Sequence, residues 1–261
     1  MVAAAQTATD GTRIRLLSYN IQVGINTMKA HHYLTHSWRH LVPHRRRFNN
    51  LDSIAHQISG YDIVGLQEVD AGSLRSNHVN LTEYLAQKAS FPFWHHRINR
   101  KLGNIAQHSS GMLFRLRPSE IVVHKLPGLI PGRGVCMARF GNKDNPLVVF
   151  NIHLSLSSRA RKNQLEYITD LIHDYEHVII MGDLNTSPDS EEMQSLFRRT
   201  RLNPPEEQLN TFPSWQPNLH FDHILVSDRL MIEHVSVLNH SYSDHLPIAM
   251  DVMVPDNIHL V

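Results

Sequence analysis

The sequence has a single cysteine, no long apolar run and almost no net charge, and each of these absences excludes a class of protein. One cysteine, Cys136, cannot form an intramolecular disulfide, which is typical of a reducing compartment and not of disulfide-stabilised secreted domains. It lies in the apolar segment GVCMARF, where we expect it to pack in the core. No apolar run reaches the roughly 18 residues of a membrane span. The formal net charge of +1 excludes a polycation, so any affinity for nucleic acid or anionic lipid must come from a local patch.

Signals for export and for division into several domains are also missing. The N-terminal segment MVAAAQTATDG has neither the basic nor the apolar region of a signal peptide, and we therefore expect a cytoplasmic protein. The 261 residues contain no internal repeat and no low-complexity linker. We predict a flexible N-terminal segment over residues 1–12, one domain over residues 13–254 and a C-terminal tail over residues 255–261.

Strand-like segments outnumber helical ones. Apolar residues recur at helical spacing over Phe48–Ile58 and over Leu165–Ile172, and Ser157 or Ser158 can cap the second of these helices. Ten apolar segments favour strands: Arg13–Tyr19, Tyr61–Val69, Ser109–Leu116, Glu120–Leu126, Gly134–Phe140, Pro146–Leu154, His177–Asp183, Asp222–Asp228, Met231–Asn239 and Leu246–Val254. The strict alternation of strands and helices that is typical of a doubly wound sheet is absent. We therefore predict one domain of mixed α/β (α+β) class, with two packed, mainly antiparallel sheets flanked by helices.

Polar residues stand where several of these strands begin or end. In HVIIMGDLNTSP, Gly182 ends a buried run, and Asp183 and Asn185 follow where a strand end needs neither a carboxylate nor an amide. Each such residue alone is typical of a solvated strand end or a helix cap. The pattern recurs, however, at other strand ends, namely at Asn20, Glu68, His153, Asp222, Asp244 and His245. Two packed sheets bring strand ends to one rim, and a rim of carboxylate and amide oxygens suits Mg²⁺ better than Zn²⁺.

Six short motifs share one order with a known family. They are SYNIQ, LQEV, NIHLSL, GDLN, FDHILVS and SDHLP, and they extend over nearly the whole chain, from Arg13 to Val254. In this order the sequence resembles the endonuclease/exonuclease/phosphatase superfamily, which has the fold of pancreatic deoxyribonuclease. The resemblance implies a four-layer α/β/β/α sandwich and divalent-metal hydrolysis of phosphoesters.

The resemblance also implies a metal site. Glu68 would be the main Mg²⁺ ligand, with Asn20 beside it, and Asp244 would support both the metal and His245. Mn²⁺ could replace Mg²⁺. Some nucleases of the superfamily carry an acidic residue two positions after the first asparagine, whereas this chain has Gln22, which cannot serve as a charged ligand.

The catalytic roles that the resemblance implies fall on five residues. Asp183 would position or deprotonate the attacking water, and Asn185 would hold a phosphate oxygen. His245 would stabilise the charge that develops on the phosphate, with its tautomer fixed by Asp222, and His153 would be a second phosphate contact. These residue types suit phosphoryl transfer, in which catalysis is mostly positioning and electrostatic stabilisation. Abasic-site repair members use a tyrosine where this chain has NIHL, so an abasic endonuclease is disfavoured.

One predicted helix begins with cations, which the helix dipole disfavours by roughly 0.3–1 kcal/mol each. Arg159 and Arg161 lie in the first turn after Ser157–Ser158, and a bound anion would reverse the sign of this effect. Because this helix follows the strand that carries His153, either arginine could contact substrate phosphate; the alternative is a solvated face. Arg133, between two glycines in GRGV, is a further candidate that could face the cleft.

Histidine is abundant, with 20 residues, and it recurs every four positions at His32, His36, His40 and His44. On a helix these side chains would form a stripe that could bind a transition metal through histidine pairs. Pro43 ends any such helix, however, and no cysteine or carboxylate lies nearby to complete a site. We favour an amphipathic surface segment that could overhang the active site as a substrate-binding lid.

Together these patterns predict a divalent-metal-dependent phosphoester hydrolase, with a phosphodiesterase that acts on nucleic acid (a nuclease) as the first expectation. The alternative is an enzyme for a phospholipid or a small-molecule phosphoester. A non-catalytic phosphate-binding module is disfavoured because Glu68, Asp183 and His245 are all present. A histidine-based metal-binding protein would rest only on the histidine stripe. The sequence indicates no obligate protein partner.

Overall fold

The computed structural model describes residues 11–24, 45–128, 132–240 and 242–260. The histidine-rich segment from His31 to His44 lies outside these residues, so the histidine stripe and the lid stay predictions. Within the described ranges, no helix is both long enough and apolar enough to cross a membrane.

Two sheets of six strands each form the centre of the molecule. The first sheet has the order β11-β12-β1-β2-β4-β3 and consists of β11 (Met231–Val237), β12 (Ile248–Pro255), β1 (Gly11–Asn20), β2 (Ile63–Asp70), β4 (Ala106–Phe114) and β3 (Phe93–Leu102). The second has the order β5-β6-β7-β8-β10-β9 and consists of β5 (Glu120–Lys125), β6 (Gly134–Phe140), β7 (Leu147–His153), β8 (His177–Asp183), β10 (Asp222–Ser227) and β9 (Leu202–Asn203). In each sheet the central pair is parallel, β1 with β2 and β7 with β8, and the other neighbours are antiparallel.

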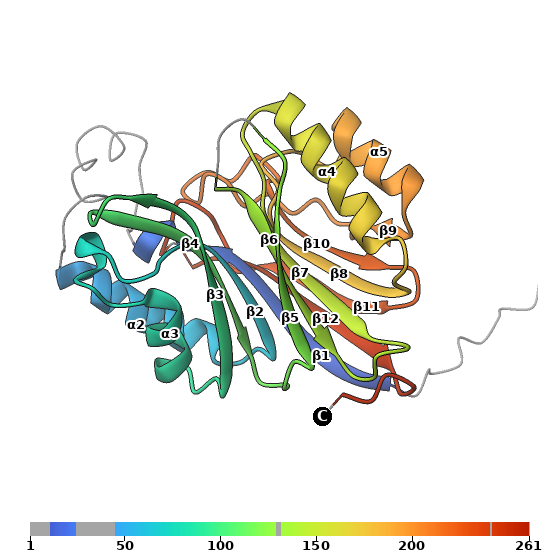
Figure 1. The fold of residues 1–261 in the computed structure, drawn as a ribbon, viewed down its shortest axis with the longest axis horizontal. Coiled ribbons are helices and arrows are strands. Elements are labelled where there is room, and N and C mark those ends of the chain that lie inside the picture. Colours follow the sequence, from blue (N-terminus) through green and yellow to red (C-terminus); the bar gives the residue numbers. More distant parts are fainter. Residues whose placement is uncertain (1–10, 25–44, 129–131, 241, 261) are drawn as a thin grey trace, which may run out of the picture.

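In the described part of the chain, two helices cover the outer face of each sheet (Figure 1). Helices α2 (Arg45–Ile58) and α3 (Leu81–Lys88) pack on the first sheet, and α4 (Ser158–Ile172) and α5 (Glu191–Arg199) pack on the second. Two short 3-10 turns, η1 (Gln22–Gly24) and η3 (Leu74–Ser76), follow β1 and β2. The predicted four-layer α/β/β/α sandwich is therefore confirmed, with two mixed sheets at its centre.

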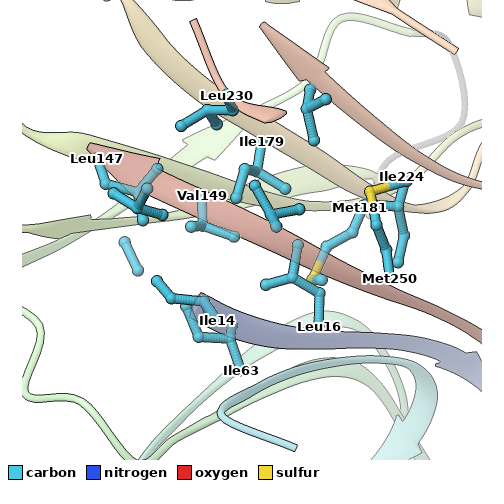
Figure 2. Close-up of a cluster of buried hydrophobic side chains, with 14 of the residues drawn as sticks. Ile14, Leu16, Ile63, Leu147, Val149, Ile179, Met181, Ile224, Leu230 and Met250 are labelled. Carbon is cyan, nitrogen blue, oxygen red and sulfur yellow. The ribbon is translucent and has the colours of Figure 1, made fainter. Parts of the chain in front are cut away.

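The largest hydrophobic core lies between the two sheets (Figure 2). The alternation of side chains along β1 builds it: Ile14 and Leu16 belong to the core between the sheets, whereas Leu17 and Tyr19 pack with α2 and α3. Cys136 is 3% exposed and lies in the inter-sheet core, so its predicted packing role is confirmed. Burial of apolar surface at roughly 25 cal/mol per Å² makes these layers the main source of stability.

Two strands and two helices of the described residues, β3, β9, α3 and α5, were not predicted from the sequence. β3 is an edge strand with no fully buried residue, and its sequence FWHHRINRKL lacks the apolar run of the other strands. β9 has only two residues. Both missed helices have side-chain caps that the sequence displays: Asn80 accepts hydrogen bonds from the first turn of α3, and Ser190 accepts one from Met193 N in α5.

The two parallel pairs end at the same rim of the sandwich. Asn20 is the last residue of β1, and Glu68 lies near the end of β2. In the other sheet, His153 and Asp183 end β7 and β8 and pair in register, and Asp222 begins the antiparallel β10 opposite Asp183. Strand-end residues that lie far apart in sequence therefore meet at one place.

The chain leaves β2 through a loop that one buried carboxylate organises. Asp70 accepts hydrogen bonds from the backbone and hydroxyl of Ser73 and from the hydroxyl of Ser76, and its Oδ2 lies 2.5 Å from Nε of Arg75. The backbone N–H of Gln107 also donates to Asp70, so the loop is fixed against β4. Burial opposes ionisation, but these donors and the arginine lower the pKa of Asp70 to about 2.

Replacing Asp70 should therefore remove a pH-dependent part of the stability. An unfolded aspartate has a pKa of about 3.9, so ionised Asp70 contributes about 2–3 kcal/mol above pH 4, and this contribution is lost as the pH falls through about 2. Urea unfolding should show a stability difference between wild type and Asp70→Asn that shrinks from pH 5 to pH 2. The exposed Asp228→Asn change should have little effect at any pH. A pH-independent loss in Asp70→Asn would contradict the prediction.

Candidate active site

Asp183 lies at the centre of a cluster that joins the two sheets. Its side chain is 2% exposed, and its Oδ2 accepts a hydrogen bond of 3.0 Å from Nδ2 of Asn20, which ends β1 in the other sheet. The same oxygen lies 3.5 Å from Nε2 of His153 and 3.9 Å from Nε2 of His245. One carboxylate oxygen thus faces polar groups from β1, β7 and the segment before β12.

His245 is held through its other ring nitrogen. Nδ1 of His245 lies 2.7 Å from Oδ2 of Asp222, and the hydroxyl of Thr211 donates to the same oxygen at 2.5 Å. Burial opposes a charge on the ring, but Asp222, Asp183 and Asp244 together hold the pKa of His245 well above its ordinary value. Asp222 therefore keeps a proton on Nδ1 and leaves Nε2 facing Asp183.

Burial shifts the pKa values of the two groups beside His245 as well. It raises the pKa of Asp183 to about 7, with the charge of Asp222 adding to the rise and His245 and Asn20 opposing it. Burial and the nearby Arg133 lower the pKa of His153 well below its ordinary value, so His153 is neutral at pH 7. The cluster therefore combines a cationic imidazole, a neutral imidazole and a carboxylate that can exchange a proton near neutrality.

The segment GDLN has the backbone geometry that this cluster requires. Gly182 has φ +144°, and a Cβ there would lie 1.9 Å from the carbonyl oxygen of Ile152, so only glycine fits beside β7. Asn185 has φ +53°, a left-handed conformation that asparagine tolerates better than most residues. In this conformation its backbone N–H donates to Oδ1 of Asp183 at 3.0 Å, and its side chain donates to the carbonyl of Leu154 at 3.0 Å.

A β-bulge places Glu68. Leu66 pairs with Gly111 and Val69 with Ser109, so two residues of β2, Gln67 and Glu68, stand opposite one residue of β4. Glu68 has φ +52°, a strained conformation for a residue with a long side chain. Burial and the nearby carboxylate of Asp244 raise the pKa of Glu68. Two carboxylates that destabilise each other's charge in this way favour a cation between them.

A buried polar clamp between the sheets holds this bulge. Asn151 of β7 donates through Nδ2 to the carbonyl oxygens of Leu66, at 3.2 Å, and Gly111, at 2.8 Å, which are the last paired residues before the bulge. Its Oδ1 accepts a 2.7 Å hydrogen bond from Nε2 of Gln67, which also lies 3.3 Å from the hydroxyl of Ser18. Gln67 and Asn151 were not predicted as site residues, although both are polar residues inside apolar strands, LQEV and VVFNIH.

Gln22 orients neighbouring polar side chains although its own side chain is uncharged. It cannot be a charged ligand, but its Nε2 donates to Oδ2 of Asp244 at 3.0 Å, and the hydroxyl of Ser243 donates to Oδ1 at 3.1 Å. Its backbone N–H donates to Oδ1 of Asn20 at 3.2 Å. Gln22 therefore orients two of the residues, Asn20 and Asp244, that the family resemblance assigns to the metal site.

Two groups of residues fit a metal ion by their donor atoms. Asp183, Asp222 and His245 offer ligand atoms that all lie within 4.8 Å of one another, so they could hold a metal. In that group, however, the proton on Nδ1 of His245 already occupies Oδ2 of Asp222. Glu68, Asn20 and Asp244 can offer only oxygen atoms as ligands, and the groups that donate to Asn20 and Asp244 are neutral rather than an imidazolium, which fits a hard cation such as Mg²⁺ or Mn²⁺ better.

A cavity of about 990 Å³ opens beside the cluster. Glu68 and His153 line it, as do two of the predicted substrate contacts, Arg133 and Arg159. The third, Arg161, does not line it: its guanidinium pairs with Glu192 at 2.9 Å and donates to the carbonyl of Leu156. Further lining residues were not singled out in the sequence, namely Asn99, Arg100, His108, Ser109, Ser155, Leu156 and Asn163.

Breaking the polar clamp should destabilise the protein. Asn151→Leu keeps a similar side-chain volume but removes the buried hydrogen bonds to the carbonyls of Leu66 and Gly111, and it leaves the amide of Gln67 with only the longer contact to the hydroxyl of Ser18. Each such group costs about 1–3 kcal/mol, so we expect a loss of at least about 2 kcal/mol in the free energy of unfolding, measured in urea. The same change at the exposed Asn142 should alter stability by less than about 0.5 kcal/mol. Equal effects at both positions would sink this account of the clamp.

Many solved structures have a similar fold. The chain is similar to an endonuclease/exonuclease/phosphatase family protein from Bacteroides thetaiotaomicron, with 16% identity, a TM-score of 0.70, and coverage of 93% of this chain and 98% of the other. A mannosyl-6-phosphatase from Bacteroides thetaiotaomicron has 16% identity and a TM-score of 0.68 over 92% of this chain and all (100%) of the other. A humanized TDP2 from D. rerio has 16% identity and a TM-score of 0.65 over 92% and 98%. At these identities the likeness concerns the fold.

A family model assigns the chain to a family, whereas the structural likeness supports only the fold. No curated protein sequence matches the chain. The model of the endonuclease/exonuclease/phosphatase family, however, matches residues 17–245, which include every residue of the cluster from Asn20 to His245. The six motifs, the two-sheet sandwich and this match agree. The chain therefore belongs to the endonuclease/exonuclease/phosphatase family.

Proposed function

We propose that this protein is a divalent-metal-dependent phosphoesterase, and that the cluster around Asp183 is its active site. Members of the family are hydrolases that act on phosphoester bonds. The observation that carries the proposal is the contact of Asp183 with Asn20, His153 and His245 at the rim where both sheets end. A degenerate phosphate-binding module would have no need of a buried acid with its pKa near 7 beside a cationic imidazole.

In the proposed reaction Asp183 positions the attacking water and accepts its proton. The backbone N–H of Asn185 and the side chain of Asn20 each hold one oxygen of this carboxylate. A pKa of about 7 suits a general base at neutral pH, because the group is ionised often enough to act and basic enough to take a proton. A positioned base contributes roughly 10²–10⁴-fold in rate.

His245 and His153 would stabilise the phosphoryl group. The imidazolium of His245, fixed by Asp222, places a positive charge where negative charge develops on the non-bridging oxygens. Neutral His153, whose Nε2 lies 3.5 Å from the same carboxylate oxygen of Asp183, offers a second hydrogen-bond contact. The side chain of Asn185 now donates to the carbonyl of Leu154, and it would have to turn from there to hold a phosphate oxygen.

Glu68, Asn20 and Asp244 would hold the metal, with Gln22 and the clamp at Asn151 keeping the ligands in place. Mg²⁺ is the proposed ion, and Mn²⁺ is the proposed substitute. When bound, such a cation polarises the phosphoryl oxygen and neutralises the leaving oxygen. The elevated pKa of Glu68 beside Asp244 supports this position, since a cation there would relieve the repulsion between the two carboxylates.

Nucleic acid is the substrate that the sequence predicts, and a phospholipid or small-molecule phosphoester is the second candidate. The second candidate is favoured by the cavity, whose volume of about 990 Å³ lies at the upper end of the range of small-ligand sites. Arg133 and Arg159 are the proposed substrate contacts; Arg161 could join them only by leaving Glu192. A cytoplasmic location remains a prediction from the sequence.

Replacement of Asp183 tests the active-site assignment. Asp183→Asn should lower kcat/KM by about 10²–10⁴-fold, because the amide cannot accept the proton of the attacking water. The assay is Mg²⁺-dependent hydrolysis of a panel with bis(p-nitrophenyl) phosphate, p-nitrophenyl phosphate, single-stranded DNA, RNA and phospholipid vesicles. The exposed Asp189→Asn variant is the matched control. Full activity of folded Asp183→Asn on the preferred substrate would refute the assignment.

Replacement of Glu68 tests the metal site separately. EDTA should abolish hydrolysis, and Mg²⁺ or Mn²⁺ should restore it. In Glu68→Gln, the metal concentration that gives half-maximal activity should rise at least about tenfold, and calorimetric titration of Mn²⁺ should show the same weakening without substrate. Glu206→Gln, on an exposed loop, is the control. Unchanged Mn²⁺ affinity in Glu68→Gln would move the metal to another group, with Asp183, Asp222 and His245 as the first alternative.

A further inference from the structure

Charge is distributed very unevenly along this nearly neutral chain. Residues 84–165 contain 13 Lys and Arg but only two acidic residues, Glu120 and Asp144. The rest of the chain contains 12 Lys and Arg against 22 Asp and Glu. The net charge of +1 therefore hides a continuous basic segment that makes up about a third of the sequence. In the structure this third comprises the end of α3, strands β3 to β7 and the first half of α4.

Three arginines of this basic segment line the cavity beside the proposed active site. Arg100 comes from the edge strand β3, Arg133 from the residues just before β6, and Arg159 from the first turn of α4. Arg100 and Arg133 are brought together by a close approach: a Cβ on Gly132 would lie 2.7 Å from the carbonyl oxygen of Asn99 and 3.1 Å from Cβ of Arg100. Only a glycine before Arg133 permits this contact between the two sheets, and GRGV supplies it.

Two other arginines of the segment already have carboxylate partners. Arg139 pairs with Glu120, and Arg161 pairs with Glu192. Arg100 and Arg159, in contrast, are exposed and form no ion pair with a residue that the structure describes. Among the residues that the structure describes, Glu68 is the one carboxylate that lines the cavity, and the proposed function assigns it to the metal.

Arg133 is the inner member of the set. It is only partly exposed, and burial lowers its pKa, while the charges of Glu68 and Asp183 oppose this fall. Arg133 thus borders the proposed catalytic groups, and the exposed side chains of Arg100 and Arg159 line the same cavity, whereas Asp183 and His245 are not among its lining residues. Two polar side chains, Asn99 and Asn163, also line this cavity.

We propose that Arg100 and Arg159 form a subsite for a second phosphate group of the substrate, separate from the phosphoester that is hydrolysed. The inference rests on the proposed function, because it assigns the second phosphate to the substrate of that reaction. The subsite itself can bind an anion whether or not turnover occurs. Guanidinium groups bind phosphate through paired N–H donors, which suits this ligand over a simple monovalent anion. The cavity volume of about 990 Å³ leaves room for a linker between the two phosphates.

The second phosphate could belong to a nucleotide or to a phosphorylated lipid headgroup, and two pairs of substrates distinguish these sources. The nucleotide pair is thymidylyl-thymidine without and with a 5′-phosphate; the headgroup pair is glycerophosphoinositol without and with a 4-phosphate. Wild type should prefer the doubly phosphorylated member of one pair by at least about tenfold in kcat/KM. Arg100→Ala/Arg159→Ala should reduce that preference to within about twofold. The control is Arg117→Ala/Lys143→Ala, which removes two exposed cations of the same segment from the loops β4–β5 and β6–β7, and it should keep the preference.

A binding measurement separates failure of the subsite from failure of the proposed function. Inorganic pyrophosphate is titrated calorimetrically into metal-free protein in EDTA. Its affinity should fall at least about tenfold in the Arg100/Arg159 double variant and stay unchanged in the Arg117/Lys143 control. Such binding without turnover of any substrate would support the subsite and count against the phosphoesterase. Asp183-dependent turnover with equal kcat/KM within both pairs, or pyrophosphate affinity that ignores Arg100 and Arg159, would overturn the subsite and leave the phosphoesterase standing.

Discussion

One hydrogen bond, from Asn20 at the end of β1 to Asp183 at the end of β8, joins the two sheets at the rim on which the rest of the site depends. It can form because each sheet has a parallel central pair and the two pairs end at the same edge of the sandwich. Antiparallel neighbours then bring Asp222 and the segment with His245 to that edge. The sheet topology, and not any local motif, therefore decides which residues meet.

The second constraint is electrostatic. Isolated buried charges are costly, so the groups of this cluster can be ionised only in combination. The cationic ring of His245 offsets Asp222 and Asp183, whereas Glu68 and Asp244 still repel each other. This residual repulsion is where a cation would be most favourable. The acidic rim also lies beside a cavity lined by arginines, so the field changes sign over a short distance, as binding of a metal together with an anionic ligand requires.

Strained backbone conformations accompany these side chains. Glu68 and Asn185 both have positive φ, and Gly182 allows the approach of β7 that no other residue would. The clamp of Asn151 and Gln67 crosses the core to satisfy the carbonyls beside the bulge at Glu68. Such strain persists only where the surroundings determine it fully, and here hydrogen bonds from the opposite sheet do so.

The sequence by itself determined the elements whose patterns are local. Buried runs revealed most of the strands, apolar spacing revealed α2 and α4, and polar residues at strand ends, such as Asp183, marked the rim. Only the tertiary structure decided the pairing of Gln22 with Asp244, the diversion of Arg161 to Glu192 and the position of Arg100 beside the residues preceding β6. The physical reason is range: hydrophobic period and capping act over a few residues, whereas Asn20 and Asp183 are 163 positions apart and meet only through the packing of two sheets.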